Sequence, residues 1–264
     1  MSAIAIPRVR ATLILHPLSS GRTKPCVVFC TDAEGDSVEV VVKWRAGSEL
    51  KETGSVCELM AGLLADDLDL PVPKPFIVEI ENGFHRSVTK ADVAELAENS
   101  VGPNFGCQRL PVGAGTWPKD KPVPVMLRPF AAEILAFDVL IQNPDRRRDN
   151  PNLLWSGEEI HLCDHEQAFS FLAGVLGWQP PWTGQGLDFY RNHVFYQQLT
   201  GLAHNWDRLS GALDALTDSR LNEYLAAVPN EWRTNNAADR IADYLRDARR
   251  NREALFAVIN RLLQ

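Results

Sequence analysis

Three polar side chains, Asp145, Asn150 and Asp164, have types and spacing that suit phosphoryl transfer. Asp145 and Asn150 are five residues apart in one polar loop, and Asp164 directly follows a short apolar run. Transfer of a phosphoryl group from a nucleotide needs a carboxylate that orients the attacking hydroxyl, and oxygen ligands that hold metal ions against the phosphates. A loop aspartate, a loop asparagine and a second aspartate can supply these parts.

Two short strands are expected to bring Asp164 back beside Asn150. Residues 152–155 (NLLW) and 159–163 (EIHLC) are apolar runs on either side of a turn that contains Gly157. Runs of this kind around a short turn are typical of a β-hairpin. The hairpin places the end of its second strand next to the loop that precedes its first strand.

The second half of the chain is expected to be mainly helical. A helix is predicted over 129–142, because apolar residues line one face and Pro129 suits a first turn. The polar loop 143–152 follows it. Several amphipathic helices are predicted from about 193 to the end, the last of them over 238–264.

The first half is expected to be a three-stranded antiparallel meander followed by a helix and further strand. The predicted strands, rich in β-branched and aromatic residues, cover 11–17, 25–32, 37–44 and 76–80. A helix is predicted over 54–67, where Ser55 would cap the helix and Glu58 would complete a capping box. A second, short helix is predicted over 88–97.

Prolines and glycines mark the connections between these parts. Three prolines within 70–75 predict a stiff, extended connector. Residues 99–124 hold several glycines and prolines and are expected to be rich in loops. We place the boundary between the two halves near 105–125.

Lys43 and Glu58 are a candidate charged pair in the first half. Lys43 ends an apolar strand and Glu58 lies on the next helix, so the two side chains could meet across a cleft. A lysine at a strand end is otherwise most simply a solvated surface residue. A glutamate at this helix position is otherwise a capping-box residue, and the sequence leaves both interpretations open.

The segment NPDRRRDN, a hairpin and then LCDHE, over 143–166, resembles the catalytic segment of the HipA-like kinases, which reads approximately N-x-D-R-x-x-x-N, hairpin, D. The phosphoinositide kinases carry a related arrangement. The order of elements in the first half also fits, so the resemblance covers most of residues 11–170. It implies one α+β, two-lobed protein-kinase-like unit over 1–264, with an antiparallel-sheet N-lobe at 8–110 and a mainly helical C-lobe at 111–264.

The resemblance implies a role for each matching residue. Asp145 would be the catalytic aspartate, and Asn150 and Asp164 would bind Mg²⁺. Lys43 would hold the phosphates of ATP, and Glu58 would orient Lys43. Further ATP contacts would come from a phosphate-covering loop and an inter-lobe hinge, through Ser20, Gly21, Arg22, Thr23, Cys107 and Gln108.

The chain departs from the family pattern in three places. The loop at 19–24 has one glycine instead of three, so fewer backbone N–H groups are expected over the phosphates. His165 and Glu166 follow Asp164, where kinases have Phe-Gly. The extra N-terminal subdomain of full-length HipA toxins has no expected counterpart, so toxin activity and an antitoxin-type partner are unsupported.

Two further clusters have simpler interpretations. His161, Cys163 and His165 alternate, so a strand would place all three on one face, as zinc ligands can lie. Zinc usually needs a fourth ligand or a water position, and no second cluster is evident. The arginines at 146–148 are most simply a solvated charge run, although one of them could meet phosphate or the acidic cluster in this loop.

Composition narrows the function classes. The formal net charge of −7 argues against a protein built around nucleic acid, which usually shows a basic face. No apolar stretch approaches the roughly 18–20 residues of a membrane span, and the N-terminus shows no signal peptide. Five cysteines without a CxxC pair are expected to be reduced and buried in a cytoplasmic protein.

The leading interpretation is an ATP-dependent kinase that phosphorylates a hydroxyl group, as a HipA-like serine/threonine protein kinase would. A nucleotide-binding pseudokinase is an alternative, although it would more often have lost Asp145. A small-molecule kinase is another, but 170–200 holds only one acid, Asp188, which points away from cationic aminoglycosides. A non-enzymatic scaffold would leave the 143–166 segment unexplained. The sequence does not identify the acceptor.

Overall fold

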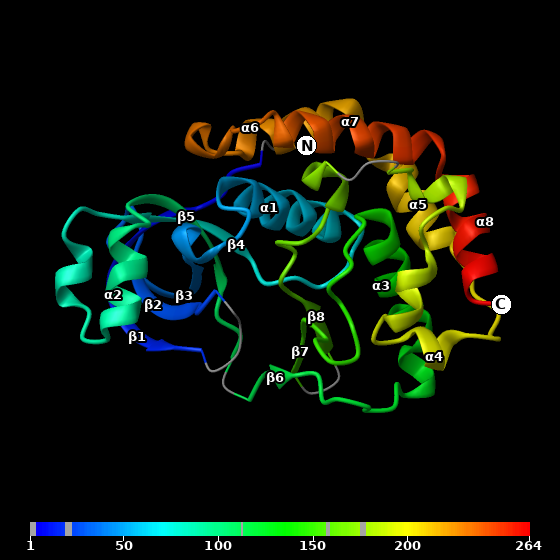
Figure 1. Ribbon diagram of the computed structural model, residues 1–264, viewed down its shortest axis with the longest axis horizontal. Helices are drawn as coiled ribbons and strands as arrows, with labels where there is room; N and C mark the ends of the chain where they lie inside the picture. Colours follow the sequence, from blue (N-terminus) through cyan, green and yellow to red (C-terminus); the bar gives the residue numbers. More distant parts are fainter. Residues whose placement is uncertain (1–3, 19–22, 112, 157–158, 175–177) are drawn as a thin grey trace.

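The computed structural model describes the chain except for residues 1–3, 19–22, 112, 157–158 and 175–177. It is a mixed structure of helices and strands. The strands of the first half lie at one end of the molecule, and most helices of the second half lie at the other (Figure 1).

Five strands of the first half close into a barrel in the order β1-β2-β3-β5-β4. They are β1 (Arg8–Pro17), β2 (Cys26–Thr31), β3 (Ser37–Lys43), β4 (Pro75–Ile80) and β5 (Gly102–Gln108). The predicted antiparallel meander is confirmed for β1, β2 and β3. The barrel closes because β1 also pairs in parallel with β4, from Arg8↔Ile77 to Arg10↔Glu79. Local sequence patterns do not reveal this distant pairing.

Small β-branched side chains fill the barrel. Val28, Val40, Val42 and Val78 are fully buried, in keeping with the fit of branched side chains to a pleated surface. Gly106 on β5 lies among them. A Cβ at Gly106 would come within 2.5 Å of a Val40 methyl and 2.7 Å of a Val78 methyl, so the strands can approach this closely only with glycine at that position.

The prediction of loop over 99–124 is wrong for Gly102–Gln108, which form β5. The sequence of β5, GPNFGCQ, has two glycines and a proline, which disfavour strands. It nevertheless pairs with β3 on one side and β4 on the other, so tertiary pairing overrides the weak local preference. The remainder of the segment contains only the short strand β6 (Gly115–Thr116).

Helix α1 (Glu52–Asp67) begins before its predicted start. Ser55 is buried inside the helix, and the capping position is Lys51, whose φ is 49° and whose side chain makes no capping bond. The predicted capping box of Ser55 and Glu58 is therefore wrong. The turn before the helix is held by Ser48, whose Oγ accepts a backbone N–H two residues later at 3.1 Å.

The helical half follows the predicted order. The predicted helices at 88–97 and 129–142 are present as α2 (Ala91–Glu98) and α3 (Arg128–Leu140). β7 (Leu153–Ser156) and β8 (Glu159–Leu162) form the predicted hairpin, and β6 adds a third strand to it. The later helices are α4 (Tyr196–Leu199), α5 (Asp207–Ala215), α6 (Asp218–Ala227), α7 (Ala237–Arg250) and α8 (Arg252–Leu262).

The single terminal helix predicted over 238–264 is wrong, because the chain turns at Asn251 between α7 and α8. Asn251 has φ −104° and ψ 16°, outside the helical geometry, and its Nδ2 donates to the carbonyl of Asp247 at 2.8 Å. Both helices keep an apolar face, so the periodicity continues through the turn and hides it. Folding back lets α8 pack against α5 while α7 packs against α1 and α6.

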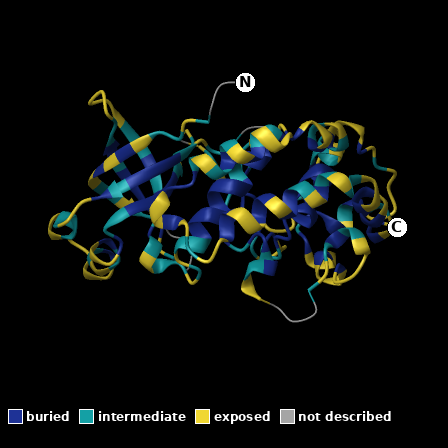
Figure 2. Cartoon of the chain, turned by 90° about the horizontal axis from the view of Figure 1, so that it is seen from above, coloured by how far each residue is buried: buried dark blue, intermediate teal, exposed yellow. Residues whose placement is uncertain are grey.

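Buried apolar side chains form two clusters. One fills the barrel, and the other runs from α1 through α3 to α8. Figure 2 shows the buried residues gathered in the interior of the molecule, and α3 is buried at every position from Ala131 to Leu140. Helix α1 therefore belongs to the core of the helical half, although it directly follows the barrel strand β3 in the chain.

Two expectations from composition concern the cysteines and the membrane. All five cysteines are unpaired; Cys26, Cys30 and Cys57 are buried, while Cys107 and Cys163 are partly buried. None of the helices in the described ranges combines the length and apolar character needed to cross a bilayer.

Candidate active site

The ammonium group of Lys43 lies between two carboxylates from distant parts of the chain. Its Nζ donates to Glu58 Oε1 and, at 2.7 Å, to Asp164 Oδ1. Lys43 ends β3, Glu58 lies within α1 and Asp164 follows β8. The side chain of Lys43 is 17% exposed and that of Glu58 only 5%. Three residues singled out separately in the sequence are thus in direct contact.

The two carboxylates that share Lys43 have pKa values shifted in opposite directions. Burial raises the pKa of Glu58 to about 7; the charge of Asp164 adds to this and Lys43 offsets part of it. The charge of Lys43 lowers the pKa of Asp164. Burial alone would lower the pKa of Lys43, but both carboxylates hold that pKa well above its ordinary value. Lys43 and Asp164 are therefore charged at neutral pH, and Glu58 is close to its midpoint.

Two asparagine side chains orient Asp145. Its Oδ2 accepts hydrogen bonds from Nδ2 of Asn150 at 2.9 Å and from Nδ2 of Asn152 at 3.1 Å. Its backbone N–H donates to Oδ1 of Asn143 at 3.1 Å, a turn that Asx side chains commonly form. The guanidinium of Arg147 lies 3.6 Å from the other carboxylate oxygen. Asp145 is thus held in one orientation while its side chain stays 28% exposed.

A buried polar network under the loop fixes its shape. Asp138 on α3 is fully buried and accepts bonds from Arg146 Nε at 2.6 Å and from Asn143 Nδ2 at 3.0 Å. The ring of His193 lies 3.0 Å from the same carboxylate. Burial alone would raise the pKa of Asp138, but Arg146 and His193 hold it below its ordinary value. The loop is therefore anchored through charge-assisted hydrogen bonds.

Arg146 also joins the loop to the hairpin that carries Asp164. Its Nη1 donates to the carbonyls of Asn152 and, at 3.2 Å, Cys163. The N–H of Cys163 donates to the same Asn152 carbonyl at 3.2 Å. Asp164 then adopts a left-handed backbone, with φ 61°, at the point where its side chain leaves the strand direction and reaches Lys43. The predicted return of Asp164 to the loop is present.

The oxygens of Asn150 and Asp164 fit a hard divalent cation. Among described partners, Asn150 uses its Nδ2 for Asp145 and Asp164 uses one carboxylate oxygen for Lys43, which leaves one side-chain oxygen on each. Mg²⁺ is commonly bound by one or two side-chain oxygens together with substrate phosphates and water. Within the described ranges no three His, Cys, Asp or Glu side chains gather around a common point, so a metal ion held here would need further oxygen ligands.

The other predicted nucleotide-binding residues are more scattered. Thr23 lines a small cavity together with Lys43 and Glu58. Cys107 lies on β5, close enough for the charges of Lys43 and Glu58 to act on its thiol. The next residue, Gln108, is exposed. Three residues of the predicted phosphate loop lie outside the described residues: Ser20, Gly21 and Arg22.

His165 and Glu166 belong to the site, although their roles were not predicted from the sequence. His165 is buried with its Nδ1 3.8 Å from Glu58 Oε2, and burial lowers its pKa to about 3. Glu166 accepts a bond from Ser48 Oγ at 2.8 Å and lines the same cavity as Thr23. Their position directly after Asp164 was the signal that could have identified them.

The interpretation of 146–148 as a solvated run is wrong for Arg146, which is fully buried, whereas Arg147 and Arg148 are about half exposed. Its partner Asp138 lies in the apolar stretch ILAFDVLI. A buried carboxylate needs a cationic or hydrogen-bonding partner, so that aspartate was a usable signal for the network. Asn152 was also missed; it has φ 47°, a conformation that asparagine tolerates better than most residues.

The alternating residues His161, Cys163 and His165 do not line one strand face. β8 ends at Leu162, so the alternation stops before His165. His165 turns inward toward Glu58, while Nε2 of His161 lies 3.4 Å from a Glu159 oxygen.

Comparisons with known proteins agree with this geometry. The family model of the HipA-like kinases matches residues 11–255. The search of curated proteins gives no match. Among solved structures, the chain is similar to the crystal structure of the proinflammatory kinase CtkA of Helicobacter pylori, with 13% identity and a TM-score of 0.54. The alignment covers 98% of this chain and 100% of that one, and at this identity the likeness concerns the fold.

Proposed function

The chain belongs to the HipA-like kinase family, and from this premise we propose that it transfers the γ-phosphoryl group of ATP to a hydroxyl group of a protein serine or threonine. The observation that carries the proposal is the Lys43 ammonium group held by both Glu58 and Asp164. A lysine fixed beside an ionised aspartate is the arrangement that binds nucleotide phosphates and a metal ion together in kinases.

In the proposed reaction, Asp145 accepts the proton of the acceptor hydroxyl. The oxygen of this hydroxyl forms a new bond to the γ-phosphorus. The bond between the γ-phosphorus and the β–γ bridging oxygen breaks at the same time, and ADP leaves with the bridging oxygen. Asn150 and Asn152 hold the Asp145 carboxylate in place, so its orientation is set before the acceptor arrives.

Lys43 contacts the α- and β-phosphates in this proposal, and Glu58 keeps the ammonium group in position. Asn150 and Asp164 would hold Mg²⁺, which supplies positive charge against the phosphate oxygens. The carboxylate of Asp164 is 40% exposed, so the charge that binds metal is accessible from the cleft side.

The remaining nucleotide contacts are proposed from the likeness to the family pattern. Thr23, with Ser20, Gly21 and Arg22, would lie over the phosphates, and Cys107 and Gln108 would lie near the base. Residues 8–110 and 111–264 would then act as the N-lobe and C-lobe of one kinase-like unit, with ATP between them. Cytoplasmic location is part of the proposal, and an antitoxin-type partner is not.

The test is phosphate transfer by the purified protein with Mg²⁺ and γ-labelled ATP, using a mixed serine and threonine peptide pool as acceptor. Asp145→Asn and Asp164→Ala are compared with wild type, and circular dichroism checks that both variants fold. We expect labelled peptide with wild type and a loss of at least 100-fold in both variants, in line with the size of general-base and metal contributions. Equal labelling by all three proteins would contradict the catalytic assignment, and ATP binding without turnover would favour a pseudokinase.

A further inference from the structure

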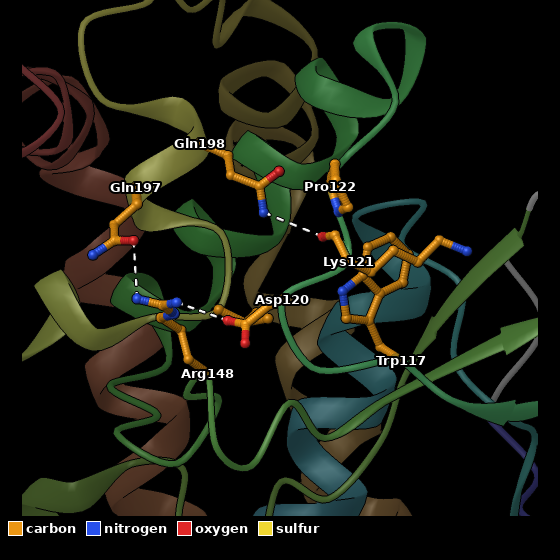
Figure 3. A pocket seen from close by; sticks show the side chains of 8 residues that line it. Trp117, Asp120, Lys121, Pro122, Arg148, Gln197 and Gln198 are labelled. Atoms are coloured by element: carbon orange, nitrogen blue, oxygen red, sulfur yellow. Dashed lines mark hydrogen bonds and ion pairs between the residues drawn. The ribbon is translucent and has the colours of Figure 1, made fainter.

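A groove runs along the side of the Asp145 loop, outside the cleft assigned to ATP. It consists of two adjoining hollows of about 300 and 530 Å³. The hollows share Asp120 and Arg148 as a common wall. Figure 3 shows the smaller hollow, with Arg148 turned toward Asp120 and Gln197.

Three segments form the groove walls. One wall is the connection that precedes α3, from Trp117 to Pro122. The floor is the second part of the catalytic loop, residues 147–149, and the far wall comes from Asn192 and from Gln197 on α4. The groove therefore begins on the same loop that presents Asp145.

The groove leads to the proposed catalytic aspartate. Arg147 lines the larger hollow, and its guanidinium lies 3.6 Å from Asp145 Oδ1. The backbone N–H of Arg147 also donates to the Asp145 carbonyl at 3.0 Å. Asp145 itself does not line either hollow, so Arg147 is the residue that connects the groove to the carboxylate proposed to take the hydroxyl proton.

The groove is locally basic on an acidic protein. Its lining has four basic and two acidic side chains, whereas the whole chain has a formal net charge of −7. The basic residues are Lys119, Lys121, Arg147 and Arg148, and the acidic residues are Asp120 and Asp149. The charges are about half exposed, so they are available to a ligand that approaches from solvent.

Part of this charge is held in place. Lys121 Nζ lies 3.8 Å from the ring centre of Trp155 and 5.3 Å from that of Trp117, so its ammonium is held by these rings, and its side chain extends past Trp117 away from Arg148 (Figure 3). Arg148 donates to Asp120 at 2.7 Å, and Asp120 has φ 59°. Asp120 thus occupies the anion position beside Arg148. An acidic side chain from another molecule could take the same position.

We propose that this groove docks the acceptor as an extended polypeptide segment with acidic residues next to the phosphorylated hydroxyl. The inference rests on the proposed function and adds the class of acceptor. A polypeptide fits better than a small molecule, because small-molecule sites carry only a few polar groups and enclose their ligand, whereas this groove has six charged side chains among its lining residues. An acidic side chain of the acceptor displaces Asp120 from Arg148 or meets Lys119.

Two fluorescein-labelled peptides test the groove without ATP. Each has a central serine, flanked in one by glutamates and in the other by lysines, and binding is followed by fluorescence anisotropy at low salt. Wild type is expected to bind the glutamate peptide roughly tenfold more tightly, and physiological salt is expected to reduce the difference, because it screens exposed charges beyond about 8 Å.

Variants with opposite expected effects keep the test independent of folding. Arg148→Glu is expected to lose or invert the preference. Asp120→Asn removes the competing anion and tolerates the left-handed backbone, so it is expected to bind the glutamate peptide several-fold more tightly. Arg250→Glu is the matched control, since Arg250 also forms an exposed pair with an aspartate, at 3.0 Å, but on α7. It is expected to behave like wild type.

The inference is overturned if wild type binds both peptides equally, if Arg148→Glu keeps the preference, or if an acidic peptide binds less well than a single-stranded oligonucleotide of equal charge. Phosphorylation of the same peptides separates this inference from the proposed function. Preferential binding of the glutamate peptide without any transfer contradicts the proposed function alone. Transfer to both peptides at equal kcat/KM contradicts the docking inference alone.

Discussion

At the scale of single residues, the site holds two carboxylates with only one ammonium group between them. Lys43 provides one positive charge for Glu58 and Asp164, and Glu58 is the more buried of the two acids. The carboxylate with less access to water is therefore the one whose ionisation is held back. This asymmetry leaves Asp164 charged and ready for a cation, while Glu58 responds to pH near neutrality.

Glu58 is expected to make stability depend on pH. Its folded pKa, about 7, lies above the ordinary value of 4.5, so the folded state binds this proton more tightly than the unfolded state does. The stabilisation is complete below about pH 4.5 and is lost as pH rises through about 7. The free energy of unfolding of wild type relative to Glu58→Gln should fall over this range, by about 3 kcal/mol at most.

Urea denaturation of both proteins from pH 4.5 to 8 measures that difference, because titrating groups distant from Glu58 contribute equally to the two proteins. A difference that stayed constant across the range, or rose with pH, would show that Glu58 is ionised throughout.

Asn152 is expected to act through the orientation of Asp145. Asn152→Gly removes the amide donor but suits the left-handed backbone, so the fold should be little affected. We expect kcat to fall roughly tenfold with little change in KM for ATP, because a misplaced carboxylate impairs the transfer step. Asn235→Gly, at φ 54° on the surface, is the matched control. A change in KM alone would place Asn152 in nucleotide binding instead.

The sequence was sufficient to single out Asp145, Asn150 and Asp164 as candidate site residues and insufficient to find the residues that support them. Asp145, Asn150 and Asp164 stand out because polar types recur at fixed spacing around a hairpin. Asn152, Asp138 and Arg146 act through buried hydrogen bonds, and burial is a property of the packed molecule. Arg146 shows this best, since two exposed arginines follow it and make the run look solvated.

At the scale of elements, α3, the loop and the β7–β8 hairpin are held as one unit by Arg146. Its side chain bonds Asp138 on α3 and two carbonyls at the ends of the hairpin. α3 and both hairpin strands also contribute side chains to one apolar cluster, so Arg146 adds a polar link to elements that already pack together.

Arg146→Met is expected to destabilise the fold by about 3–5 kcal/mol, because it leaves the Asp138 carboxylate buried with fewer partners. Arg148→Met removes the exposed pair with Asp120 from the same loop and should cost less than about 1 kcal/mol. Chemical denaturation midpoints of the two variants give the comparison. Similar losses of stability in both variants would mean that the buried pair contributes no more to stability than the exposed pair.

Elements were predictable where they carry their own pattern. The meander, the hairpin and α3 have alternating or helical periodicity and were found. Strand β5 has almost none and is defined by its two neighbours, and the turn at Asn251 interrupts two helices whose apolar faces continue the same period. The start of α1 was misplaced because a Ser-x-x-Glu pattern can lie inside a helix as well as at its end.

At the scale of the whole molecule, the site lies across two cores. Lys43 is carried by a barrel strand, whereas Glu58 is carried by α1, which packs with the helical half. Links from the C-terminal helices reinforce α1: Arg220 and Tyr224 both bond Asp67 at its end, at 2.7 Å. The C-terminal helices therefore influence the position of Glu58 without touching it.

Trp232 is expected to show this coupling. Its ring is fully buried, and its Nε1 donates at 3.0 Å to the carbonyl of Pro103 on β5. Trp232→Ala should cost about 3–5 kcal/mol of unfolding free energy, as large core truncations do. Phe189→Ala, at a 42% exposed residue, should cost less than about 1 kcal/mol. Thermal denaturation followed by circular dichroism measures both, and equal losses would contradict a shared core.

The pairing of β1 with β4 is the seam that closes the barrel, and it affects the tendency of the protein to aggregate. Most exposed sheet edges are templates on which another chain can add a strand, and proteins protect them to avoid aggregation. Here the barrel leaves no such edge among its five described strands, but the seam is only three residue pairs long, with ion pairs from Arg8 to Glu79 at 2.6 Å and from Arg10 to Glu81 at 3.7 Å. Changes to residues 8–10 would therefore expose β4 to strand addition, and insolubility would be the first sign of damage there.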